Sequence, residues 1–147
     1  MFSVKGLGVG ISVAVLAITG ISSGLTALDS ASATAVPKLV VTPSTKLHNG
    51  ELVNVTGTGF KVGDSVYVVE CLASAKGAAQ CNTLGAIPAT INTKGQLPRT
   101  TFKVITGKIG DGKCGTKKSN LTTCAISAGN ITGGDSAVAR ITFKAVG

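Results

Sequence analysis

Four cysteines are the residues of this 147-residue chain whose type and spacing could do chemistry. Cys71 and Cys81 stand ten positions apart, and so do Cys114 and Cys124. Zinc-binding cysteines usually stand about two to four positions apart, so the spacing predicts no metal site. It favours two local disulfides, Cys71–Cys81 and Cys114–Cys124. The alternative is a long-range bond joining two sheets, as in antibody domains, which also bury a Trp near the first cysteine; this chain has no Trp.

Catalytic residues are sparse. The one histidine, His48, stands beside the turn signal Asn49-Gly50, so we interpret it as an exposed turn residue. No nucleophile-elbow pattern is present. Glu70 directly precedes Cys71 at the end of an apolar run, and we expect it to face outward from a strand, with a place in a cleft as the alternative. The sequence therefore predicts no catalytic residue and no enzyme.

The first 33 residues have the pattern of an export signal. Lys5 precedes an apolar stretch at Leu7–Leu16, and small residues at Ala31, Ala33 and Ala35 offer cleavage sites. We predict a signal peptide over residues 1–33, cleavage after Ala33 or Ala35, and a mature domain over residues 34–147 without stable membrane insertion. A retained anchor is the alternative, because the apolar character continues to about residue 28. The predicted location is extracellular, free or associated with the cell envelope, where disulfides form.

Short strands separated by Gly, Pro and Asn turns run through the mature region, and no segment has the period of a helix. The expected strands cover residues 39–42, 52–56, 66–69, 87–92, 99–105, 122–127 and 137–143. In the second of them, Val53 and Val55 should share one face and Leu52, Asn54 and Thr56 the other. Phe60 should join the core, and residues 106–113 should form a glycine-rich turn. The pattern predicts an all-β, immunoglobulin-like, seven-stranded antiparallel Greek-key sandwich.

The predicted mature chain is basic, with 13 Lys or Arg residues against 5 Asp or Glu residues. Such a field attracts anionic surfaces, so we expect weak, nonspecific binding to an anionic polymer or DNA. The lysines are mostly scattered, which is typical of a soluble secreted protein, and only Lys113, Lys117 and Lys118 cluster. Aromatic residues make up 3% of the chain, too few to interleave with the basic residues for base stacking.

Several motifs together resemble the neocarzinostatin family, small secreted actinobacterial apoproteins that carry and shield an enediyne antibiotic chromophore. The matching segments are Val40-Val41-Thr42-Pro43-Ser44-Thr45, Leu47, Asn49-Gly50, Val53-Asn54-Val55, Gly57-Thr58-Gly59-Phe60 with Gly63, the Cys71–Cys81 spacing, and the length from Cys124 to Phe143. The resemblance covers nearly the whole mature chain. It implies a monomeric sandwich plus a two-stranded ribbon bearing Cys71–Cys81, with a ligand cleft between the ribbon and the sandwich.

The chain departs from the family at the residues that hold the chromophore. Ala73 stands where members have a Trp, Gly129 stands where they have a Ser, and Phe102 is the only Phe between the two disulfides. Antibiotic-carrying members are also usually acidic, whereas this chain is basic. The ligand-binding set that the resemblance implies is Cys71, Leu72, Ala73, Cys81, Ala125, Ser127 and Gly129.

Two functions follow from these features. The resemblance implies a secreted carrier that holds a hydrophobic small molecule noncovalently; apart from an enediyne-like chromophore of this kind, we expect no cofactor. The alternative is a secreted immunoglobulin-like interaction module that binds an anionic envelope polymer or a protein and takes no small ligand.

Overall fold

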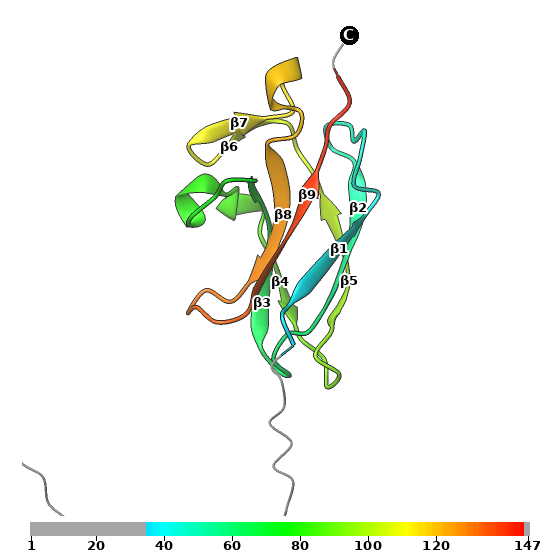
Figure 1. Cartoon of the computed structure of the whole chain (residues 1–147), viewed down its shortest axis with the longest axis vertical. Coiled ribbons are helices and arrows are strands. Elements are labelled where there is room, and N and C mark those ends of the chain that lie inside the picture. The colour runs from blue at the N-terminus through cyan, green and yellow to red at the C-terminus, as the bar shows by residue number, and fades with distance from the viewer. Residues whose placement is uncertain (1–34, 146–147) are drawn as a thin grey trace, which may run out of the picture. The chain divides into compact units, whose positions relative to one another are not determined.

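The computed structural model describes residues 35–145 as two antiparallel sheets packed face to face, with a small hairpin beside them (Figure 1). One sheet has the order β1 (Lys38–Thr42), β2 (Leu52–Thr58), β5 (Leu97–Lys103). The other has the order β4 (Ile87–Thr90), β3 (Ser65–Leu72), β8 (Cys124–Gly129), β9 (Ser136–Ile141). The hairpin pairs β6 (Gly107–Ile109) with β7 (Gly112–Cys114). Three short 3₁₀ turns are η1 (Ala78–Gln80), η2 (Thr83–Gly85) and η3 (Lys118–Asn120). The predicted seven-stranded sandwich is confirmed. Within residues 35–145, no helix is long and apolar enough to cross a membrane.

Period-two alternation places the core between the sheets. Val53 and Val55 on β2 are fully buried while Leu52 is 61% exposed, so the two predicted faces are separated and the valine face is the one that meets the core. Phe60 also enters the core, with 4% of its surface exposed. The apolar residues of the two inner faces therefore pack against each other, and burying them provides the main stabilisation of the sandwich.

The prediction that Glu70 faces outward is wrong. Glu70 is fully buried, on the same face of β3 as Val66 and Val68. Both faces of this strand carry apolar residues, so the alternation does not say which face meets the core. β3 lies between β4 and β8 in its sheet, and the face of that sheet that carries Val66, Val68 and Glu70 packs toward the core.

The predicted glycine-rich turn over residues 106–113 contains the β6–β7 hairpin, which Gly110 and Asp111 close. Gly110 has a φ of +56°, a backbone conformation that favours glycine. Ile109 is fully buried beneath this hairpin. The hairpin is the two-stranded ribbon of the fold, and Cys114 at its end bonds to Cys124 on β8.

The ribbon is not the one the resemblance implied, which was to bear Cys71–Cys81. Those two cysteines are bonded as predicted, but they meet in a single isolated bridge. The chain between them includes the 3₁₀ turn η1, because its alanines and glycine have little tendency to form a strand. Both local disulfides are confirmed, and the stapled ribbon is β6–β7.

Candidate ligand-binding cleft

A cavity of about 640 Å³ opens on the outer face of the β4-β3-β8-β9 sheet. We call it the cleft. Its floor consists of side chains that alternate outward from three adjacent strands. They are Tyr67, Val69 and Cys71 of β3, Ser127 and Gly129 of β8, and Ser136 and Val138 of β9. The register puts Tyr67, Gly129 and Ser136 in one row across the sheet and Val69, Ser127 and Val138 in the next.

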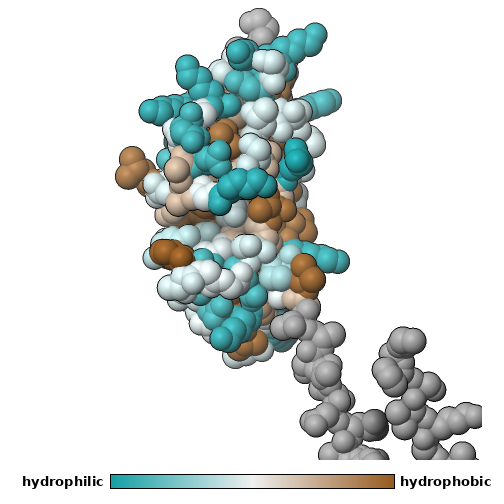
Figure 2. All heavy atoms as spheres, turned by 60° about the vertical axis from the view of Figure 1, so that its left-hand side comes forward, coloured by the Kyte–Doolittle hydropathy of each residue, from teal (hydrophilic) through white to brown (hydrophobic). Residues whose placement is uncertain are grey.

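Two loops wall the cleft. The first, which we call the disulfide wall, covers residues 72–81 and contributes mainly alanine, glycine and leucine. The second, which we call the glycine loop, covers residues 130–134 between β8 and β9. Figure 1 shows these segments on the left, in green and orange, and Figure 2 brings that side forward. Across the middle of this face, neutral and hydrophobic residues form a band between more hydrophilic regions.

The disulfide wall is held by the sheet behind it and by the β6–β7 ribbon. The Ala73 amide donates to the Thr123 carbonyl at 2.7 Å, and the Asp111 amide at the ribbon tip donates to the Ala79 carbonyl at 3.0 Å. A Cβ at Gly112 would lie 2.5 Å from Leu72 Cδ1, so a larger residue there would have to displace the Leu72 side chain. The second disulfide thus supports the wall of the cleft through the ribbon that it anchors.

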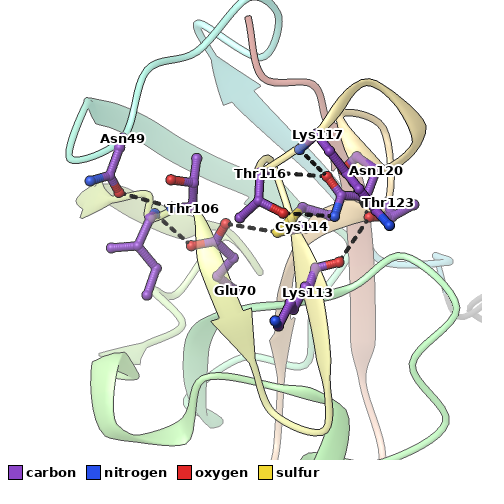
Figure 3. The surroundings of a disulfide bond; sticks show 11 residues. Asn49, Glu70, Thr106, Lys113, Cys114, Thr116, Lys117, Asn120 and Thr123 are labelled. Carbon is purple, nitrogen blue, oxygen red and sulfur yellow. Dashed lines mark hydrogen bonds between the residues drawn. A yellow bond between two sulfur atoms is a disulfide. The ribbon is translucent and has the colours of Figure 1, made fainter. Parts of the chain in front are cut away.

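Beneath the sheet, Glu70 lies against the Cys114–Cys124 disulfide (Figure 3). The Ile105 amide donates to Glu70 Oε2 at 2.9 Å, and Oε1 lies 3.9 Å from Cys114 Sγ. Burial raises the pKa of Glu70 to about 7, and the Ile105 hydrogen bond opposes this rise. Because the two sulfurs are bonded to each other, this group of residues has no thiolate to offer a metal. Glu70 lies on the inner face of the sheet, so it is not a group that a ligand in the cleft would meet.

The model of the neocarzinostatin family matches residues 39–143. The chain belongs to the neocarzinostatin family. Macromomycin of Streptomyces macromomyceticus is 27% identical to it over 132 residues, which cover 86% of this chain and 90% of macromomycin. The solved structure of macromomycin superposes with a TM-score of 0.58 at 25% identity and covers 74% of this chain and 99% of its own. The solution structure of apokedarcidin gives a TM-score of 0.50 at 28% identity and covers 76% of this chain and 99% of its own.

In this neocarzinostatin-family fold, six of the seven residues predicted to bind a ligand line the cleft. They are Cys71, Leu72, Ala73, Cys81, Ser127 and Gly129. The seventh, Ala125, pairs with Cys71 in the sheet but is fully buried and does not line the cleft. The role of this set in ligand binding stays a prediction.

The lining residues that the sequence analysis missed include Tyr67, Val69, Lys76, Ile131 and Val138. The strand period could have found two of them, since Val69 and Tyr67 lie two and four positions before Cys71 and share its face. Tyr67 is the only aromatic residue among the described residues that line the cleft. Lys76, Ile131 and Val138 come from segments whose approach to β3 depends on the fold.

His48 lies outside the cleft, in the turn that precedes β2. It is exposed, and its backbone amide donates to Glu51 Oε2 at 2.8 Å. Among the described residues that line the cleft there is no histidine and no carboxylate. These lining residues offer apolar surface, a few hydroxyls and amides and one ammonium.

Proposed function

We propose that this chain is an exported carrier that holds a hydrophobic small molecule noncovalently in the cleft. The observation that carries the proposal is the cleft itself, whose volume of about 640 Å³ lies within the range of drug-sized ligand sites, roughly 300–1,000 Å³. Its lining is mostly small and apolar. Membership of a family of carrier apoproteins supports the same conclusion.

Affinity in such a site would come mainly from the burial of apolar ligand surface. A ligand that buries about 250 Å² of apolar surface gains roughly 6 kcal/mol from leaving water, before the entropy cost of binding is subtracted. The hydroxyls of Tyr67, Ser127 and Ser136 lie on the floor and would orient the ligand's polar groups. Both cysteines that line the cleft are bonded to each other, so no thiol is free to attach a ligand covalently.

The ligand class closest to the family would be an enediyne-like chromophore. Ala73 on the disulfide wall offers no ring for stacking, and Tyr67 on the floor is the aromatic residue that remains. A chromophore would therefore be held chiefly by shape and apolar contact, with one ring beneath it. The glycines of both walls have no side chain, so they leave room for a bulky molecule.

Mass spectrometry of the protein purified from its own host tests the proposal. A co-purifying small molecule that dissociates without any covalent adduct is the expected result. The matched variants are Ser127→Phe, which fills the floor, and Thr101→Phe, which adds the same ring to an exposed position on β5. The ligand should be lost from the first variant and kept by the second. Equal retention by both would place the ligand elsewhere and contradict the proposal.

Export is part of this proposal, and the two disulfides support it. The predicted signal peptide, residues 1–33, lies outside the described residues. N-terminal sequencing of the protein from the culture medium should begin at Thr34 or Val36. A start at Met1 on a cell-associated protein would favour the retained anchor.

A further inference from the structure

The cleft carries a single charge, and that charge is positive. Among the described residues that line the cleft, Lys76 on the disulfide wall is the only side chain that is charged at neutral pH. We propose that the cleft selects an apolar ligand that bears an anionic group, such as a carboxylate, sulfonate or phosphate, placed to meet Lys76. This inference rests on the proposed carrier function and names the class of ligand.

Two carboxylates come close to the cleft in sequence, and the fold turns both of them away. Glu70 lies between Val69 and Cys71, which line the floor, yet alternation points Glu70 into the core. Asp135 lies between two lining residues of the β8–β9 connection, but its side chain accepts a hydrogen bond from the Lys61 amide outside the cleft. Strand alternation keeps Glu70 out of the cleft, and the hydrogen bond from the Lys61 amide holds Asp135 away from it, so neither carboxylate neutralises Lys76 or attracts a cation there.

The backbone that carries Lys76 is fixed. Its amide donates to Gln80 Oε1 at 2.6 Å, and the preceding turn is closed by the Ala75 amide, which donates to the Leu72 carbonyl at 2.9 Å. The Cys71–Cys81 disulfide closes the same loop. The ammonium is exposed on a flexible stem, so it can follow an anionic group while the apolar body of the ligand occupies the floor.

Electrostatics at this position would favour an anion more than the net charge alone does. The formal net charge of +8 attracts anions to every face, and salt screens that attraction over about 8–10 Å. An anionic group of a ligand seated on the apolar floor would lie within a few ångströms of the Lys76 side chain, where the attraction between two charges is much less screened than at longer range. A cationic ligand in the same place would be repelled and would find no carboxylate to pair with.

Two fluorescent probes with the same rings separate the charge from the apolar body. They are 8-anilinonaphthalene-1-sulfonate, which is anionic, and N-phenyl-1-naphthylamine, which lacks the sulfonate. Dissociation constants are measured at 0.15 M salt for the folded full-length mature protein and for three variants: Lys76→Gln, Lys76→Arg and Lys94→Gln. Lys94 is an exposed lysine in the β4–β5 turn, outside the cleft, so its substitution removes the same charge from elsewhere.

We expect Lys76→Gln to weaken binding of the anionic probe about fivefold and to change binding of the neutral probe less than about twofold. Lys76→Arg and Lys94→Gln should leave both probes within about twofold of the wild type. An unchanged affinity of the anionic probe in Lys76→Gln would overturn the inference while the carrier function stood. An equal loss in Lys94→Gln would overturn it as well, because the general field would then be the cause.

The Ser127→Phe variant separates this inference from the function on which it rests. Loss of both probes in that variant places them in the cleft and supports the carrier function, whatever the charge series shows. Binding that survives Ser127→Phe, or no binding of either probe to the wild type, would contradict the carrier function and the inference together.

Discussion

Replacing Glu70 with Gln should remove a pH dependence from the stability of the fold. Glu70 is fully buried, and its only strong hydrogen bond comes from the Ile105 amide. Gln is nearly the same shape, and its carbonyl oxygen can accept the same hydrogen bond. The substitution therefore removes the ionisable group and leaves the packing almost unchanged.

Burial raises the pKa of this carboxyl from 4.5 to about 7, so the folded state holds the proton more tightly than the unfolded state does. The contribution of Glu70 to the free energy of unfolding is fully present below pH 4.5 and falls as the pH rises to about 7. Each unit of pKa is worth about 1.36 kcal/mol, so the total loss is about 3 kcal/mol. Above that window the loss is complete.

Urea denaturation of the wild type and of Glu70→Gln, at pH values from 4 to 8.5, measures the effect. The two proteins should agree within about 1 kcal/mol at pH 4, where both side chains are neutral, and Glu70→Gln should be about 3 kcal/mol more stable at pH 8.5. The difference between the two curves cancels the titration of the other carboxylates.

A second variant, Glu70→Leu, separates the charge from the hydrogen bond. Its stability should vary with pH in the same way as that of Glu70→Gln. At every pH it should be about 1–3 kcal/mol less stable than Glu70→Gln, because the Ile105 amide is left without its acceptor. A constant difference between the wild type and Glu70→Gln across the pH range would refute the reasoning, since the carboxyl would then titrate alike in the folded and unfolded states.

Three further predictions concern the wall, the ribbon and the surface. Ala73→Trp should bind a planar aromatic probe about two- to tenfold tighter in a fluorescence titration, because the new ring can stack on the ligand; unchanged affinity would mean that position 73 does not reach the ligand. In thermal melts, Gly110→Ala should lose about 1–3 kcal/mol of stability, since the φ of Gly110 is +56° and a Cβ would overlap the Ala79 carbonyl. The control Gly77→Ala, with open space around it, should lose almost none. Equal losses of stability in the two variants would argue against the ribbon as a support for the wall. Retention on an anionic polymer column should be weak and should fall steeply as salt rises, and retention at high salt would reveal a specific site.

Local pattern is sufficient to predict much of this fold. The alternation in Leu52–Val55 predicts which side chains of β2 share a face, and the equal spacing of the cysteines predicts both disulfides. These are short-range properties. A strand's period is set by its own backbone, and the entropy cost of closing a loop is smaller when the two cysteines are close in sequence.

The ribbon was harder to predict because its sequence has no clear strand signal. Three of the eight residues in Gly107–Cys114 are glycines, and glycine is depleted in strands. Glycine suits the ribbon nonetheless, because Gly110 turns the hairpin against the Ala79 carbonyl and Gly112 leaves room for the Leu72 side chain. Ala79 and Leu72 lie about thirty and forty positions earlier in the chain, which no local window contains.

Local patterns in the sequence predict the seven strands of the sandwich, their alternation and the cysteine pairs, and its motifs indicate the family. Which face of β3 meets the core depends on the tertiary structure. Val66 and Val68 alternate with Tyr67 and Val69, so the two faces are equally apolar. One of them packs in the sandwich and the other lines the cleft. The period of a strand fixes which side chains share a face, but only the neighbouring strands and loops determine what each face touches. This is why Glu70 is buried, and why Lys76 is the one charged side chain among the described residues that line the cleft.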